Sequence, residues 1–146
     1  MRFHTSLPVK SISDTVAFYR VLFESEPVKT KPDYAKFLPP GAALNISFHQ
    51  NPHAVGPFTD LHLGFEMPDR AALDRAHARL AEAGFITVER ETSVCCYASQ
   101  DKFWVTDPNG YQWEVYLLLE DTEAKFAPAA SRDASPTAAA GASSCC

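Results

Sequence analysis

Two pairs of adjacent cysteines, Cys95-Cys96 and Cys145-Cys146, have the side chains best suited to chemistry in this sequence. Neighbouring cysteines can close only a small, strained disulfide ring, so we expect free dithiols in a reducing compartment. Thiolate pairs bind soft metals and metalloids well. Each pair is therefore a candidate binding site for such an element.

A single carboxylate, Glu114, stands out in the strand-like run from Tyr111 to Leu119. Side chains alternate between the two faces of a strand, so Trp113 and Val115 share one face and Glu114 lies on the less apolar one. A buried lone carboxylate is costly, so Glu114 must be solvated, hydrogen-bonded or bound to a cation. It is a candidate metal ligand, and the alternative is an ordinary solvent-facing glutamate.

Size and charge exclude several classes of function. With 146 residues, 46% of them hydrophobic, the chain is long enough to bury one core. Its net charge of -5 argues against nucleic acid or an anionic membrane as the main partner. There is no apolar run of about 20 residues and no secretory signal, so we expect a soluble cytoplasmic protein.

Patterns of hydrophobic residues predict five elements in the order β-α-β-β-β in the first half of the chain. The helix is expected from Asp14 to about Phe23, with Ser13 as its N-cap. The strands are expected at residues 2–9, 27–31, 34–38 and 43–49, with a turn at Pro39-Pro40-Gly41.

The same order restarts near residue 60. A strand containing His62 leads to a helix that Asp69 caps and Gly84 ends. Further strands are expected at residues 85–88, 96–99, 102–106 and 111–119, with a hairpin turn at Asp107-Pro108-Asn109-Gly110. By pattern, His4 corresponds to His62 and Asn45 to Glu114, which indicates an internal repeat.

These patterns predict one domain and a tail. The domain spans residues 1–120, with module one at about 1–50 and module two at about 60–120. Residues 121–146 are rich in Ala, Ser and Pro without an apolar period, and end in Cys145-Cys146. We expect this tail to be disordered, because it offers little apolar surface to offset its ordering entropy.

The paired β-α-β-β-β pattern, with a histidine on each first strand and Glu114 on the last, resembles the vicinal oxygen chelate superfamily of glyoxalases, extradiol dioxygenases and bleomycin-resistance proteins. The resemblance covers about residues 1–120 and implies an α+β fold, in which two modules form a cupped mixed sheet with helices outside. It implies that His4, His62 and Glu114 hold a metal. Asn45 occupies the position of a fourth ligand, where a neutral amide would bind weakly, and two histidines with one carboxylate suit iron(II).

A narrower resemblance concerns Thr92 to Tyr116, TSVCCYASQDKFWVTDPNGYQWEVY. This stretch is similar to the signature of the organoarsenical carbon-arsenic lyases, a group that overlaps with proteins described as cadmium-induced. The similarity implies a non-heme iron enzyme that uses Fe(2+) and dioxygen to cleave trivalent organoarsenicals such as methylarsenite, releasing arsenite. His4, His62 and Glu114 would hold iron, and Cys95 and Cys96 would bind arsenic.

Two sulfurs of consecutive residues can meet one arsenic only if the backbone leaves regular β geometry, since neighbouring strand residues point to opposite faces. We therefore predict an irregular segment within Val94 to Tyr97. Gln100 and Lys102 lie nearby, and we assign them no role beyond a supporting contact.

Other interpretations remain open from the sequence. The protein could sequester cadmium or arsenite through its thiols without turnover, or act as a glyoxalase-like isomerase or transferase. Cys145-Cys146 could be an accessory arsenic-binding pair, an incidental tail or a prenylation site. The chain could be a monomer or a homodimer with exchanged modules. His49, His53 and His77 are read as loop or surface residues.

Overall fold

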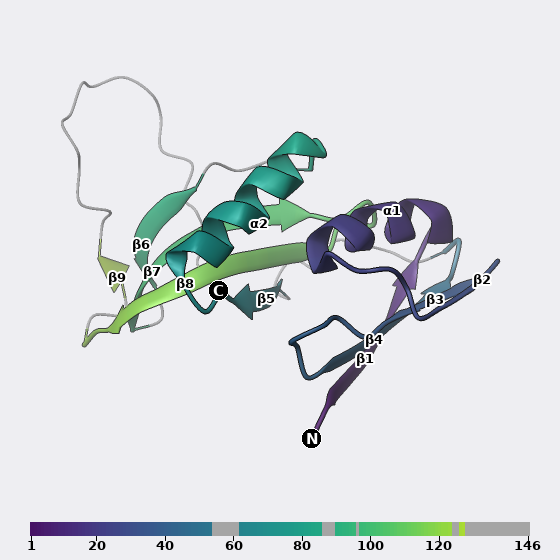
Figure 1. The fold of residues 1–146 in the computed structure, drawn as a ribbon, viewed down its shortest axis with the longest axis horizontal. Helices are drawn as coiled ribbons and strands as arrows, with labels where there is room; N and C mark the ends of the chain where they lie inside the picture. The colour runs from purple at the N-terminus through teal and green to yellow at the C-terminus, as the bar shows by residue number, and fades with distance from the viewer. Residues whose placement is uncertain (54–61, 86–89, 96, 124–125, 128–146) are drawn as a thin grey trace.

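The computed structural model describes residues 1–53, 62–85, 90–95, 97–123 and 126–127, and for His62, Cys95, Phe126 and Ala127 it describes the backbone only. Two β-α-β-β-β units follow one another, and a short further strand comes after the second (Figure 1). The elements are β1 (Phe3–Val9), α1 (Ile12–Phe23), β2 (Lys29–Lys31), β3 (Tyr34–Phe37), β4 (Leu44–Gln50), β5 (His62–Glu66), α2 (Arg70–Glu82), β6 (Glu91–Cys95), β7 (Ala98–Thr106), β8 (Gln112–Asp121) and β9 (Phe126–Ala127).

Each unit forms one mixed sheet. The first has the strand order β1-β4-β3-β2 and the second β5-β8-β7-β6-β9. In both units the first strand runs parallel to the last, and the remaining neighbours are antiparallel. The predicted α+β fold with two β-α-β-β-β modules is confirmed. Neither helix in the described part of the chain is long and apolar enough to span a lipid bilayer.

The first helix begins earlier than the sequence pattern predicted. Ser11 is the N-cap, with an extended backbone at φ -137° and a side chain that accepts the N–H of Asp14 at 3.3 Å. Ser13 was the predicted cap, which was wrong because it already lies within the helix. In α2 the predicted cap is confirmed, since the Asp69 carboxylate accepts the N–H of Ala72 at 2.7 Å.

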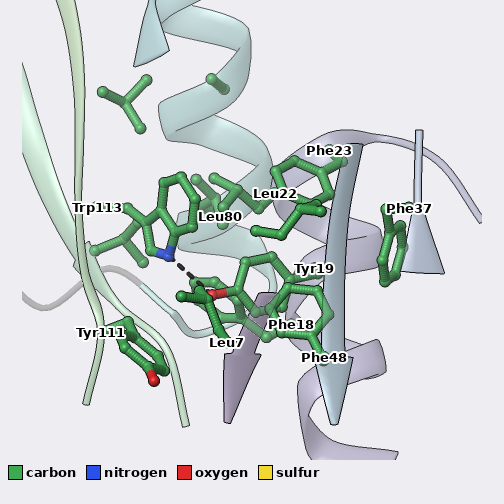
Figure 2. Close-up of a cluster of buried hydrophobic side chains, with 14 of the residues drawn as sticks. Leu7, Phe18, Tyr19, Leu22, Phe23, Phe37, Phe48, Leu80, Tyr111 and Trp113 are labelled. Carbon is green, nitrogen blue, oxygen red and sulfur yellow. Dashed lines mark hydrogen bonds between the residues drawn. The ribbon is translucent and has the colours of Figure 1, made fainter. Parts of the chain in front are cut away.

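Aromatic side chains from both units meet in one core between the helices and the sheets (Figure 2). Tyr19 of α1 packs on Phe48 of β4, with ring centroids 4.2 Å apart. Phe65 of β5 stacks on Trp113 of β8 at 5.1 Å, and Phe23 of α1 meets the edges of both rings. Because Phe23 and Tyr19 contact strands of both units, the two sheets share a single core.

The turn before β8 also joins the two units. Asp107 accepts backbone N–H groups from Asn109 and Tyr111, both at 2.8 Å, and the hydroxyl of Tyr19 at 3.0 Å. Trp113 donates its indole N–H to the same Tyr19 hydroxyl at 2.9 Å (Figure 2). Burial, and then the charge of Asp107, raises the pKa of Tyr19 well above its ordinary value, so the phenol stays protonated as a donor.

Asn109 extends this network to the start of α1. Its side chain accepts the N–H of Lys10 at 2.8 Å and donates to the Thr15 hydroxyl at 3.1 Å. The sequence predicted a hairpin turn at 107–110, which is confirmed by the 3.0 Å bond from the Gly110 N–H to the Asp107 carbonyl and the positive φ of 92° at Gly110. The sequence did not predict that this turn also connects the two modules.

The strands around the cysteine pair also differ from expectation. The predicted strand at 102–106 and the last two residues of the one at 96–99 belong to one continuous β7, while β6 ends at Cys95, which pairs with Ala98. The predicted strand at 85–88 lies largely outside the described residues.

The prediction of disorder throughout 121–146 was wrong for Phe126–Ala127. These residues form β9, whose backbone pairs with Val94 and Cys95 on the edge of β6. A free strand edge presents unpaired N–H and C=O groups, and composition alone gave no sign that the chain returns to cover it.

Candidate metal and thiol site

Glu114 is buried, which rules out the solvent-facing interpretation. The residue is 8% exposed, and its carboxylate accepts a hydrogen bond from the ammonium of Lys102 at 2.9 Å. Lys102 lies on the neighbouring strand β7 and is 1% exposed. We expected the carboxylate at this position to need a cation or hydrogen bonds. Lys102 supplies both, although the sequence suggested no more than a supporting contact for it.

Gly64 gives Glu114 its close neighbour on the other side. The two residues are paired in the parallel β5–β8 ladder. A Cβ at position 64 would lie 3.0 Å from the Glu114 carbonyl oxygen and 3.5 Å from the Glu114 Cβ. A side chain here would be in tighter contact than usual, so β5 and β8 would have to move slightly apart beside the candidate ligand.

His4 has the geometry of a histidine prepared to bind a metal. Its Nδ1 donates to the backbone carbonyl of Asn45, its ladder partner on β4, at 3.1 Å. A carbonyl can only accept, so Nδ1 carries a proton, and the tautomer that this bond favours has its lone pair on Nε2. The His4 residue is exposed, so Nε2 is open to a ligand.

The side-chain oxygen of Asn45 is a buried hydrogen-bond acceptor. This Oδ1 atom has no hydrogen-bond partner among the described residues. An unsatisfied buried oxygen favours a cation or an ordered donor beside it. Asn45 shares the face of His4, because paired residues of neighbouring strands lie on the same face.

His62 is placed by its backbone alone. It pairs with Gln112 in the β5–β8 ladder, two residues before the pair of Gly64 with Glu114. In the first unit, by contrast, His4 pairs directly with Asn45. The predicted correspondence of the two units thus carries a two-residue offset, which keeps the same face because strand side chains have a period of two.

Tyr116 lies on the same face of β8 as Glu114. Its hydroxyl donates to Glu66 at 3.4 Å. Burial first, and then the charges of Glu66 and Glu114, raises the pKa of Tyr116 above its ordinary value of 10.0. The phenol is therefore a protonated hydrogen-bond donor at neutral pH.

The cysteine pair lies where β6 ends. Val94 and Cys95 are in regular pairing with Ser99 and Ala98, so the predicted irregularity does not begin at Val94. Tyr97 has a left-handed backbone at φ 67°, which is unusual for a tyrosine and marks a tight connection. The Cys95 side chain, Cys96, Cys145 and Cys146 lie outside the description.

A network of ion pairs connects the start of the β6–β7 hairpin to α2. Arg90, which precedes β6, donates to both oxygens of Asp101 on β7 at 2.7 and 2.6 Å. Arg70 of α2 donates to the same carboxylate, and Arg90 also donates to Asp74 of α2. The Arg90 and Arg70 guanidinium groups lower the pKa of Asp101, which is 3% exposed.

Three residues have donor types that suit a divalent cation, two of them on the first sheet and one on the second. They offer an imidazole with a free Nε2 at His4, a buried carboxylate at Glu114 and an unpartnered oxygen at Asn45. Among the described side chains, no three of His, Cys, Asp or Glu gather into one metal-binding group. His62, the remaining predicted ligand, is not among those side chains, so the triad stays a prediction.

The sequence matches the model of the family described as the Glyoxalase/Bleomycin resistance protein/Dioxygenase superfamily over residues 3–115. The chain belongs to this superfamily. A solved member, a glyoxalase/bleomycin resistance protein/dioxygenase from Alicyclobacillus acidocaldarius, is 15% identical with a TM-score of 0.65, and the alignment covers 82% of this chain and 92% of that one. At this identity the similarity concerns the superfamily fold alone.

Closer relatives come from the comparison of sequences. The Trivalent organoarsenical cleaving enzyme of Thermomonospora curvata is 37% identical over 150 residues, covering 99% of each chain. The Cadmium-induced protein CadI of Mycobacterium tuberculosis is 39% identical over 122 residues, covering 84% of this chain and 79% of that protein. This superfamily member is thus related to organoarsenical-cleaving and cadmium-induced proteins.

Of the other histidines, two are exposed and one is half-buried. His49 on β4 and His53 are exposed, as predicted. His77 was predicted to be a loop or surface residue, which was wrong. It lies within α2, its ring meets Phe103 edge-on at 5.0 Å, and its Nε2 is buried.

Proposed function

We propose that this protein cleaves the carbon-arsenic bond of trivalent organoarsenicals such as methylarsenite, with iron(II) and dioxygen, and releases arsenite. The main support is the 37% identity to the Trivalent organoarsenical cleaving enzyme of Thermomonospora curvata along 99% of both chains. The cysteine pair and the buried Glu114 supply the residue types that this reaction needs.

In this proposal His4, His62 and Glu114 hold the metal. Iron(II) bound there would supply the activation of dioxygen, and two imidazoles with one carboxylate leave coordination positions open for it. The Asn45 carbonyl fixes the tautomer and orientation of the His4 ring, so that Nε2 is the coordinating atom. Tyr116 lies on the same face as Glu114, and its hydroxyl donates to Glu66.

Cys95 and Cys96 would bind the substrate. Methylarsenite has one methyl group and two hydroxyl groups on arsenic, and two thiols can displace both hydroxyls as water, forming two arsenic-sulfur bonds. The methyl group is then the only other substituent, so binding orients the bond to be broken. Free thiols are required, which suits a cytoplasmic location. Cys145-Cys146 would be an accessory arsenic-binding pair.

The overall reaction balances without an added reductant. Methylarsenite and one dioxygen contain the atoms of arsenite and formaldehyde. Arsenic remains trivalent, the arsenic-carbon bond breaks, and dioxygen accepts the electrons that the methyl carbon loses. We therefore expect formaldehyde as the second product in equal amount.

The test is aerobic turnover of methylarsenite by iron-loaded protein, with arsenic speciation, formaldehyde and metal content measured on the same sample. Glu114→Ala should lose turnover yet still bind the arsenical, whereas Cys95→Ser should lose both. Failure of the iron-loaded protein to form arsenite would refute the enzyme proposal. Full activity in Glu114→Ala would refute the metal assignment.

A second candidate function is binding of cadmium or arsenite by the thiols without turnover. It is favoured by the 39% identity to the Cadmium-induced protein CadI and by the softness of thiolate ligands. Tight binding of Cd(2+) together with no arsenite production from methylarsenite would support it over the first.

A further inference from the structure

Lys102 is an unusual neighbour for a candidate metal ligand. Lysine is almost never fully buried unless it is paired, yet Lys102 is 1% exposed. Its Nζ lies 2.9 Å from Oε1 of Glu114 and 5.7 Å from the ring centroid of Trp104, the ladder partner of Glu114. The ammonium is therefore held beside the carboxylate by strand register and packing.

The pair compensates two buried charges. Removing an ammonium and a carboxylate from water is costly, and each offsets the cost of the other. Without a bound cation, the Glu114 carboxylate accepts its hydrogen bond from Lys102. Without Lys102, the same carboxylate would be buried next to fewer cationic groups and would bind an added cation more readily.

A divalent cation at Glu114 must contend with this ammonium. It can share the carboxylate by using the other oxygen, or it can displace the Lys102 side chain. In the first case two cations face each other across one carboxylate, where the low dielectric of the interior strengthens their repulsion. In the second case the ion pair is lost. Both cases weaken metal binding.

We propose that Lys102 is a built-in counter-cation of Glu114, a positioning residue that holds the carboxylate in metal-free protein and competes with the metal for it. This inference rests on the proposed role of Glu114 as a metal ligand. A purely structural lysine would have the opposite effect when replaced, because loosening the site would weaken the metal.

The test is titration of the full-length, metal-free protein with Co(2+), a visible-spectrum probe in place of iron(II), followed by absorbance and by the melting temperature. Lys102→Met and Lys102→Gln remove the charge, and Gln retains a hydrogen-bond donor that protects folding. Both should bind Co(2+) on the order of tenfold more tightly than wild type. Their gain in melting temperature on saturation should be larger.

Two controls separate the local effect from net charge. Lys102→Arg keeps the charge and should bind Co(2+) like wild type. Lys29→Met removes an exposed lysine from β2 and should change little at physiological salt, where charges beyond about 8 Å are screened. Unchanged or weaker Co(2+) binding in both neutral Lys102 variants would overturn the inference.

Glu114→Gln distinguishes this failure from failure of the proposed function. If Glu114→Gln abolishes the Co(2+) spectrum while the neutral Lys102 variants bind like wild type, Glu114 is a ligand and only the competition is wrong. If Glu114→Gln binds Co(2+) like wild type, Glu114 is not a ligand, and both the metal assignment and the inference about Lys102 fail.

Discussion

At the scale of single residues, the candidate site depends on two close contacts to Glu114, one from Lys102 and one from Gly64. Neither was predicted as important from the sequence. A lysine or a glycine within a predicted strand indicates no special role as long as its neighbours on the adjacent strands are unknown. Only the pairing of β5 and β7 with β8 gives them their roles.

Gly64→Ala should destabilise the protein by about 1–3 kcal/mol, the usual cost of adding a methyl group at a tightly packed position. The added Cβ would meet the Glu114 carbonyl oxygen at 3.0 Å, and backbone cannot move aside as a flexible side chain can. Urea unfolding measures the change in free energy. An unchanged value would mean that β5 shifts freely against β8.

Asp101→Asn should reduce the free energy of unfolding by about 2 kcal/mol at neutral pH, because charge-assisted bonds to Arg90 and Arg70 are lost. The folded-state pKa of Asp101 is lowered from 3.8, so its contribution is complete above that value and is lost as pH falls through the lower folded value. The gap between wild type and variant should therefore shrink below pH 3.8. Urea titrations at several pH values measure it, and a constant gap would contradict the assignment.

At the scale of elements, the sequence predicted most helices and strands because hydrophobic periods, caps and turn residues are local signals. His4, Asn45 and Glu114 were placed on the correct strands and faces for this reason. Register is different, since it depends on packing between strands far apart in the chain. The two-residue offset between the units could not be read from either unit alone.

Helix caps give a matched pair of variants. Ser11→Ala should cost about 1 kcal/mol, because Ser11 is the cap that accepts the Asp14 N–H. Ser13→Ala, in the same exposed turn, should cost only a few tenths because the helix has already begun there. Thermal or urea unfolding of both variants checks this, and equal losses would contradict the cap assignment.

At the scale of the whole molecule, one buried hydrogen-bond network holds the two modules together. Asp107, Asn109 and Tyr19 link the β7–β8 turn to α1, although the bonded residues are 88 and 94 positions apart in the sequence. The sequence predicted the turn but not its partners, because a turn motif determines only the local backbone and not which residues pack against it. Pairing of modules within one chain therefore required the structure.

Tyr19→Phe should destabilise the protein by about 2–4 kcal/mol, because it leaves the Trp113 indole N–H without its acceptor and removes a donor to Asp107. Tyr34→Phe is the matched control, since Tyr34 is half-buried on β3 and its hydroxyl bonds to no other described residue. Urea unfolding should show one transition for both. Similar stabilities for the two variants would mean that the network does not join the modules.

Two of the four outer strands of the sheets, β2 and β9, limit further strand pairing in different ways. β2 is three residues long, fully exposed and contains Lys29 and Lys31, so like-charge repulsion discourages a second copy from extending that sheet. On the other sheet, β9 occupies the rim of β6 with the chain's own backbone. Purified protein should consequently resist fibril growth by strand addition at the β2 edge and at the edge of β6 that β9 covers.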